Sequence, residues 1–206
     1  MKKTFTLILI IFCFSILAPA KTFTITVHGN YFFNADPDFS AFYGKKKYFP
    51  EGKIALKITG NFFVWGSYAA FSSGKSGSKW SHKGLEAADI EVKDTLDKAI
   101  ISGGLGYYVG LIEKEEFAVK IELGACKISN TEETVSSNIV GGSVITSEKE
   151  TDSGIGIRGN LGITYGLYKN LFAEIAGGYL WTASKVEDYT INLGGLRFSL
   201  GLGYRF

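Results

Sequence analysis

The sequence predicts an all-β fold, an eight-stranded antiparallel up-and-down transmembrane β-barrel. The first observation is that segments along the chain alternate apolar and polar residues, which gives each predicted strand one apolar face. The second is the composition, because 26 glycines and 15% aromatic residues suit crowded barrel walls and the two boundaries between lipid and water. The third is that long and short polar connections alternate, as they do in up-and-down membrane barrels.

Residues 193–206 show the alternation most clearly. Successive side chains of a strand point to opposite faces, so this segment has one apolar, aromatic face and one polar or bare face. The apolar face carries Leu196, Phe198, Leu200, Leu202, Tyr204 and Phe206, and the other carries Arg197, Ser199, Gly201, Gly203 and Arg205. This pattern is typical of a lipid-facing barrel strand.

The extreme C-terminus carries a more specific resemblance. Ser199, Gly201, Tyr204 and Phe206 follow the order polar, any, Gly, any, any, hydrophobic, any, aromatic, which resembles the signal by which the bacterial barrel-assembly machinery recognises its clients. The whole mature chain is similar to the small eight-stranded outer-membrane barrels of the OmpA and OmpX type. The resemblance implies the fold, assembly by that machinery and an outer-membrane location. It implies no activity, because such barrels include adhesins, structural proteins, narrow channels and a few lipid enzymes.

The first 20 residues read as a secretory signal peptide. Lys2 and Lys3 precede an apolar run at 7–17 and a small-residue ending at 18–20, which is the arrangement of a cleaved leader. The run is shorter than the roughly 20 residues that a spanning helix needs. We therefore expect residues 21–206 to form the mature barrel domain, exported to the outer membrane.

The mature chain is formally neutral. Without Lys2 and Lys3 the 22 basic residues fall to 20, equal to the 20 acidic residues. Nucleic-acid binding needs an excess of Lys and Arg, so we expect no nucleic-acid partner. Cys13 would be lost with the leader, and Cys126 alone cannot form an internal disulfide. Because every backbone polar group must be paired inside hydrocarbon, we expect a closed sheet held by its own hydrogen bonds.

We expect eight strands, near 22–34, 47–59, 62–73, 97–111, 116–128, 155–167, 171–184 and 193–206. The third strand is aromatic on both faces, so its facing stays open. In the other strands before the last, the outward residues are expected to be Phe23, Ile25, Val27, Tyr31 and Phe33; Ile54, Leu56 and Ile58; Ile101, Leu105, Tyr107, Val109 and Leu111; Phe117, Val119, Ile121 and Leu123; Ile155, Ile157, Leu161, Ile163, Tyr165 and Leu167; and Leu171, Ala173, Ile175, Tyr179 and Trp181. Aromatic girdles are expected from Tyr179 and Trp181 at the outer end and from Tyr165, Tyr204 and Phe206 at the periplasmic end.

The connections fix the orientation that we expect. Long polar stretches fall near 35–46, 74–95, 129–151 and 185–192, and short ones near 60–61, 113–115 and 168–170. Barrels with both termini in the periplasm have short turns there and long loops outside the cell. We therefore expect the long stretches to be extracellular loops.

Seven charged residues fall on inward positions of the expected strands. An Arg or Lys facing lipid near the midplane would cost about 2–4 kcal/mol, so we expect a charge network in the lumen. Its members are Lys57, Lys120, Glu122, Arg158, Glu174, Arg197 and Arg205. A symmetric loop after the fifth strand would place Glu122 across from Arg158. An interior of this size is just wide enough for side chains to fill, which predicts no open pore.

The sequence offers candidates for a nucleotide-binding site, a catalytic site and a metal site, each with a simpler reading. Residues 154–159 spell G-x-G-x-x-G, but that fingerprint needs a following helix, whereas here it begins an alternating strand. Inward His28 could act as a base beside Ser102 or Ser199 in a lipid-processing enzyme, although a lumen histidine without a catalytic role is the commoner case. We expect no catalytic, cofactor or metal site, since His28 and His82 lack partners at metal-ligand spacing.

The function expected from the sequence is a structural or surface-interaction role, in adhesion or envelope integrity, with a side-chain-plugged lumen. Outer loops rich in Lys, Ser, Glu and Thr would carry it. Lys45, Lys46 and Lys47 could contact lipopolysaccharide phosphates, or could simply be solvated. A narrow channel for small or apolar solutes and a lipid A-modifying enzyme remain alternatives, and a soluble lipocalin-like barrel is the structural rival. The extracellular partner stays open.

Overall fold

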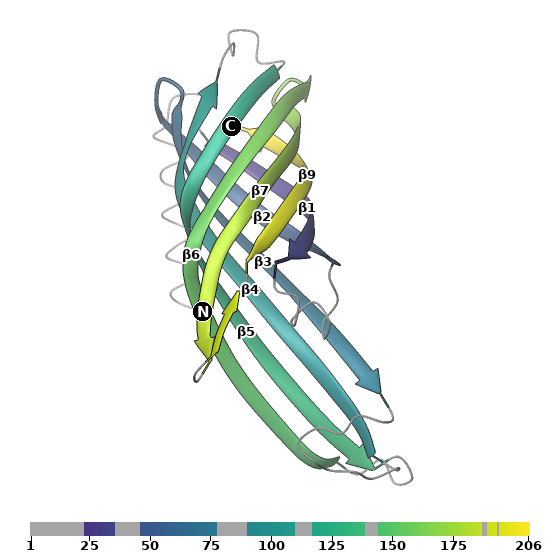
Figure 1. Ribbon diagram of the computed structural model, residues 1–206. Helices are drawn as coiled ribbons and strands as arrows, with labels where there is room; N and C mark the ends of the chain where they lie inside the picture. Colours follow the sequence, from purple (N-terminus) through teal and green to yellow (C-terminus); the bar gives the residue numbers. More distant parts are fainter. Residues whose placement is uncertain are drawn as a thin grey trace, which may run out of the picture.

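The computed structural model describes residues 23–35, 46–77, 90–109, 117–138, 144–186, 189–192 and 194–206. This part of the chain forms one antiparallel sheet that curls on itself (Figure 1). Its strands are β1 (Phe23–Asn34), β2 (Lys46–Thr59), β3 (Phe62–Gly77), β4 (Ile90–Val109), β5 (Phe117–Asn138), β6 (Val144–Tyr168), β7 (Leu171–Val186), β8 (Tyr189–Asn192) and β9 (Gly195–Arg205). The predicted signal peptide lies outside the described residues. The described residues include no helix long and apolar enough to cross a membrane.

The sheet closes into a barrel of eight wall strands. Each strand from β1 to β7 pairs with its neighbours in sequence, β9 pairs with both β1 and β7, and β6 pairs with β7. Short β8 pairs with β7 in the register that β9 also uses, since Ala183 faces Asn192 and Leu180 faces Gly195. β8 and β9 therefore belong to one wall strand, with β8 at its amino end. The prediction of an eight-stranded antiparallel barrel is confirmed.

The register also gives the stagger of the barrel. Following paired residues once around from Ala118 on β5 returns to Ile128 on the same strand, ten residues further along. The path runs through Thr164, Glu174, Gly201, His28, Glu51, Ala69 and Ile100. A stagger of this size in eight strands tilts them by about 40° from the barrel axis.

Side chains alternate between the two faces as the sequence pattern predicts. On β9 buried and exposed residues alternate from Gly195 to Tyr204, and the outward Leu200 and Leu202 are 65% and 58% exposed. The structure also settles the facing of β3: Phe63 and Trp65 are buried inside, while Phe62 and Tyr68 are exposed outside. An apolar outer surface around a closed sheet is what lipid requires.

The two described termini lie at the same end of the barrel, because the Phe206 amide donates to the Phe23 carbonyl at 2.8 Å. The tight turns at Gly60 and Lys169, both with positive φ (53° and 49°), are at this end too. Aromatic side chains pair at this end: the ring centroids of Tyr204 and Phe206 are 4.9 Å apart, and those of Phe23 and Phe206 are 5.8 Å apart. The predicted short turn at 113–115 lies outside the described residues.

At the opposite end the strands are longer than the sequence pattern predicted. Three of the stretches expected to be loops contain strand: β3 and β4 extend over 74–77 and 90–95, β5 and β6 over 129–138 and 144–151, and β7 and β8 over 185–186 and 189–192. Figure 1 shows β3 to β6 continuing well beyond β1, β7 and β9 at this end. The loop prediction was wrong there because strands in water need no apolar face, so their sequences lose the period-two signal.

The wall is held close by glycines on the inward face of β4 and β5. A Cβ added to Gly104 would lie 2.1 Å from the Leu123 carbonyl oxygen, and one added to Gly124 would lie 2.3 Å from the Gly103 oxygen. These two glycines face each other in the ladder, so the strands pack where no other residue would fit. The G-x-G-x-x-G stretch at 154–159 is continuous β6 strand, as expected of wall residues.

Candidate functional site: the lumen network and the protruding sheet

The middle of the lumen holds a dense set of buried charges. One cluster centres on Glu51, whose Oε1 lies 2.7 Å from Nη1 of Arg158 and whose Oε2 accepts a hydrogen bond from Nη1 of Arg197. Arg158 Nη1 also donates to the Ser67 and Ser102 hydroxyls at 2.8 and 3.2 Å. Glu51, Arg158 and Arg197 are each at most 5% exposed, so their charges are compensated by one another and not by water.

A second cluster lies nearer the short-turn end and contains two carboxylates and two ammonium groups. Lys120 Nζ is 3.1 Å from Glu122 Oε1 and 2.5 Å from Glu174 Oε2. Lys53 forms an ion pair with Glu122 and lies 3.4 Å from Glu174 Oε1. His28 Nε2 is 3.0 Å from the same Glu174 oxygen. Each carboxylate is therefore shared between two lysines.

Asn160 joins the two clusters. Its Oδ1 accepts from Arg197 Nη2 at 2.9 Å, and its Nδ2 donates to Glu122 Oε2 at 3.1 Å. Nearby, the Ser199 hydroxyl donates to Asn30 Oδ1 at 2.6 Å. The clusters and their amide and hydroxyl partners form one network that connects strands around the whole barrel, which we call the lumen network.

The structure buries five of the seven charged residues that the sequence analysis placed inside: Lys120, Glu122, Arg158, Glu174 and Arg197. Lys57 is instead exposed, at the end of β2 beside the turn. Arg205 is half-buried at the same rim, with its guanidinium 4.9 Å from the Phe172 ring centroid. Both residues lie on inward positions of their strands. The alternation of apolar and polar residues predicts which face a residue is on, but it does not predict how close that residue lies to the end of the barrel.

The proposed pairing of Glu122 with Arg158 is wrong. Glu122 is opposite Asn160 in the ladder, and Arg158 is opposite Gly124. The hairpin that joins β5 to β6 has an irregularity near Ser136, so its register could not be read from a symmetric loop. Glu122 pairs with lysines, and Arg158 pairs with a residue on the far side of the barrel.

Glu51 and Lys53 were missed by the sequence analysis, although they complete the network. Both lie on β2, where the outward positions between them and beside them are Pro50 and Gly52. Because neither position carries a large apolar side chain, the sequence shows no apolar–polar alternation in this part of β2. Buried Ala55 lies on the same face of β2, so counting back from it in steps of two would have found both residues. Glu51 supplies the carboxylate that Arg158 and Arg197 share.

Apolar side chains fill the lumen on both sides of the network. Toward the long-hairpin end lies a cluster of Phe32, Phe49, Ala69, Ile100, Cys126, Ile128 and Leu180, with Phe71 packed against it. Toward the short-turn end lie Ala55, Phe63 and Trp65, with Tyr108. The rings of Phe49 and Phe71 stack with their centroids 4.8 Å apart, and the rings of Phe63 and Tyr108 pack in a tilted arrangement with their centroids 4.7 Å apart. Lys98 Nζ lies 5.2 Å from the Phe32 ring centroid.

The two serines considered as partners of His28 have other hydrogen-bond partners in the structure. Ser199 donates to Asn30, and Ser102 receives Arg158, while the His28 ring contacts Glu174 and has no hydrogen-bonded partner at Nδ1. Within the described residues no group of three or more His, Cys, Asp or Glu is placed to hold a metal ion. Cys126 is buried in the apolar cluster.

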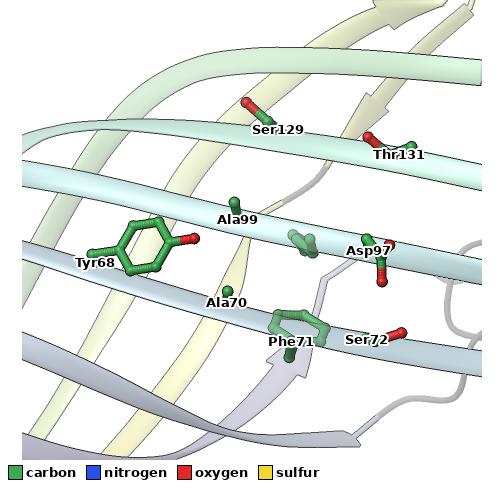
Figure 2. Close-up of a pocket in the computed structure, with 9 residues that line it drawn as sticks. Tyr68, Ala70, Phe71, Ser72, Asp97, Ala99, Ser129 and Thr131 are labelled. Carbon is green, nitrogen blue, oxygen red and sulfur yellow. The ribbon is translucent and has the colours of Figure 1, made fainter. Parts of the chain in front are cut away.

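The second region of interest is the sheet that protrudes beyond the barrel, formed by β3 to β6. Its outer face begins at a groove of about 420 Å³ lined by Tyr68, Ala70, Phe71, Ser72, Asp97, Lys98, Ala99, Ser129 and Thr131. Figure 2 shows Tyr68 at one end, Ala70 and Ala99 between, and Ser72 and Asp97 at the other end. The groove marks the level at which the outward face changes from apolar to polar.

The predicted lipopolysaccharide contact at residues 45–47 lies largely outside the described side chains. Lys47 is half-buried and shares the inward face of β2 with buried Phe49, while Tyr48 points outward and is 73% exposed. The position of Lys47 thus does not favour contact with lipid around the barrel.

Comparison with solved structures adds the following. OprG, an outer-membrane protein of Pseudomonas aeruginosa, matches with a TM-score of 0.57 at 11% identity, over 91% of this chain and 97% of that one. Ail, the attachment invasion locus protein of Yersinia pestis, matches with a TM-score of 0.50 at 15% identity, over 90% of this chain and 99% of that one. No protein-family model and no curated protein matches the sequence. The closed barrel, its apolar exterior and these two likenesses agree: the chain has the fold of the small eight-stranded outer-membrane β-barrels.

Proposed function

We propose that this protein is a non-catalytic outer-membrane scaffold that holds the protruding sheet of β3 to β6 above the cell surface for interaction with a partner. The observation that carries the proposal is strand length. β4, β5 and β6 have 20, 22 and 25 residues, against 12 in β1 and 11 in β9.

A tilted strand crosses a bilayer in about 9–11 residues. β1 and β9 are therefore just long enough to span, whereas about half of β6 lies beyond the lipid. Ordering a regular sheet outside the membrane costs conformational entropy, and its residues bury little apolar surface there to offset that cost. We therefore infer that the sheet has a function of its own. Rigid scaffolds generally carry binding function on such projecting segments.

The filled lumen supports an anchoring role over transport. The lumen network ties opposite walls together, and apolar clusters close it on both sides. The likeness to Ail, named for attachment and invasion, is consistent with surface interaction. Export through the predicted signal peptide at 1–20, recognition of Ser199, Gly201, Tyr204 and Phe206 by the barrel-assembly machinery, and contact with lipopolysaccharide are parts of the same proposal.

Compartment and fold are tested together by membrane fractionation and by heat-modifiability on a gel. A closed membrane barrel stays folded in cold detergent and shifts in mobility on boiling. Recovery of the mature chain from the soluble fraction would exclude the membrane location and favour a lipocalin-like barrel.

Orientation is tested by cysteine labelling in intact cells. The variant Ser147→Cys places a thiol on the exposed part of β6, and Lys57→Cys places one at the short-turn rim. A membrane-impermeant maleimide should label the first and spare the second, and buried Cys126 gives a low background. The reverse pattern would place the protruding sheet in the periplasm and end the surface proposal.

A further inference from the structure

The groove at the base of the protruding sheet is lined by small and hydroxyl-bearing residues. Across β3, β4 and β5 one row of the ladder consists of Ala70, Ala99 and Ser129, and the next polar row consists of Ser72, Asp97 and Thr131. Figure 2 shows the Asp97 carboxylate and the side chains of Ser129 and Thr131 around Ala99. Its volume of about 420 Å³ is that of a small-ligand site. Carboxylate and hydroxyl oxygens can accept hydrogen bonds from the hydroxyl groups of a sugar.

Lys127 lies on the outer wall directly below this groove. It is exposed on β5, next to Ser129 on the same face, and its ladder partners Ile101 and Ile155 are 57% and 77% exposed. Of the outward wall positions that the structure describes from the short turns up to this row, Lys127 alone carries a charge. Its ammonium group is therefore available to an anion outside the protein.

The height of Lys127 matches the outer boundary of the hydrocarbon. β5 runs eleven residues from Phe117, at the short-turn end, to Lys127, and a tilted strand crosses a bilayer in about 9–11 residues. Beyond Lys127 the outward residues of this wall are small or polar, beginning with Ala99 and Ser129. Lys127 thus lies at the level of lipid phosphates, and anionic lipids attract lysines at a membrane surface.

The wall below Lys127 is bare. Gly66 on β3 faces Gly103 on β4, and Gly103 faces Ala125 on β5. A Cβ added to Gly66 would meet nothing nearer than a backbone oxygen at 3.9 Å, and no side chain lies near one added to Gly103. We call Gly66, Gly103 and Ala125 the bare strip. It leaves room for a hydrocarbon chain to lie against the backbone.

Other outward glycines of the barrel are covered by aromatic rings. A Cβ added to Gly159 would lie 3.2 Å from the Trp181 ring, and one added to Gly177 would lie 3.8 Å from the Phe198 ring. The bare strip is therefore not a general property of the lipid-facing wall. It coincides with the part of the wall that carries the groove and Lys127.

We propose that this surface binds one phosphorylated glycolipid of the outer leaflet. An acyl chain lies on the bare strip, a phosphate meets Lys127, and the sugar occupies the groove against Asp97 and Ser129. The inference rests on the proposed function, because it needs the protruding sheet to face the cell surface. It gives the scaffold a lipid that steadies the base of that sheet.

The groove favours a glycolipid over a phospholipid. It extends two ladder rows beyond Lys127, from Ala99 to Asp97 on β4, and a headgroup that ends near its phosphate would leave these polar groups without a partner. Asp97 would repel a second phosphate, but its carboxylate can accept hydrogen bonds from sugar hydroxyls. The surface therefore suits a phosphate at the membrane level with a sugar above it.

The test titrates the full mature chain in detergent micelles with diphosphorylated lipid A and follows binding by native mass spectrometry. Lys127→Gln should weaken binding roughly fivefold, the effect of one lysine at an anionic lipid surface. The matched control Lys57→Gln removes an exposed lysine at the short-turn rim and should leave binding unchanged. Dephosphorylated lipid A should bind the parent and Lys127→Gln equally.

Two further variants test the bare strip and the groove. Gly66→Leu should weaken lipid A binding at least threefold, whereas Ala173→Leu, outward on β7, should not. Ser129→Leu fills the groove and should weaken binding of lipid A while leaving binding of phosphatidylglycerol unchanged. Heat-modifiability confirms that each variant is folded.

Equal affinity of the parent and Lys127→Gln for diphosphorylated lipid A would overturn the proposal. Equal affinity of the parent for phosphatidylglycerol and for lipid A would overturn it too, because the groove would then recognise no sugar. Surface labelling at position 147 without lipid A binding would exclude the lipid site and leave the proposed scaffold role intact. The reverse labelling pattern would exclude both.

Discussion

Glu51 Oε1 lies 2.7 Å from Nη1 of Arg158, and the two residues come from opposite walls of the barrel. β2 and β6 are four strands apart in either direction around the eight-stranded wall, so this ion pair crosses the full width of the lumen. An ion pair across the diameter lies in the path along the axis and fixes the distance between the walls. The same contact thus stabilises the barrel and obstructs the middle of its lumen.

Replacing Glu51 by Gln should lower the free energy of unfolding by about 3–5 kcal/mol, the cost of leaving a buried charge without its partner. In this variant the guanidinium groups of Arg158 and Arg197 lose the Glu51 carboxylate that they share. The measurement is urea unfolding of the refolded chain in lipid vesicles, followed by tryptophan fluorescence. Glu133→Gln, at an exposed position of β5, serves as the control and should not change the midpoint; an equal midpoint for both variants would contradict the role of Glu51.

The purified protein should give no large, stable single-channel conductance in planar bilayers. The lumen network is bounded on both sides by packed aromatic and aliphatic side chains, so an ion would meet apolar barriers as well as the crossed ion pair. Liposome swelling with small sugars should likewise match protein-free vesicles, while a porin in the same preparation gives the positive signal. Steady open events in the wild-type chain would favour the narrow-channel alternative.

A charge on the outer wall should cost stability only where lipid covers it. Leu200 is the central outward residue of β9 and 65% exposed, so Leu200→Arg should destabilise the barrel by about 2–4 kcal/mol in vesicles. Ser147→Arg places the same side chain on the exposed part of β6, beyond the lipid, and should cost nothing measurable. Similar costs at both positions would show that the apolar belt is not bounded where the structure puts it.

The strand segments with an apolar outer face could be predicted from the sequence, because they follow a period-two pattern of apolar residues. Leu200, Ile163 and Arg158 were each placed on the correct face on that basis. The protruding parts of β5 and β6 could not be predicted, since water accepts polar side chains on both faces. The alternation also fails at Pro50 and Gly52, which hid Glu51 and Lys53.

Which lumen charges meet could not be predicted either. The alternation gives the facing of a residue but neither its height along the axis nor its partner across the lumen. Those depend on the stagger around the whole barrel, which no single hairpin determines. Arg158 shows the consequence: its facing was right, and its assigned partner Glu122 was wrong because the true partner lies on β2.

The close approach of β4 to β5 gives the last prediction. Gly104→Ala should lower the free energy of unfolding by about 1–3 kcal/mol, since overpacking forces the backbone apart and the new Cβ would lie 2.1 Å from the Leu123 carbonyl oxygen. Gly52→Ala is the matched control: nothing lies within 4 Å of the added Cβ, and alanine limits the unfolded chain more than glycine does. It should therefore be neutral or slightly stabilising. The same urea titration compares the two, and an equally stable Gly104→Ala barrel would mean that β4 and β5 do not approach as closely as Gly104 and Gly124 allow.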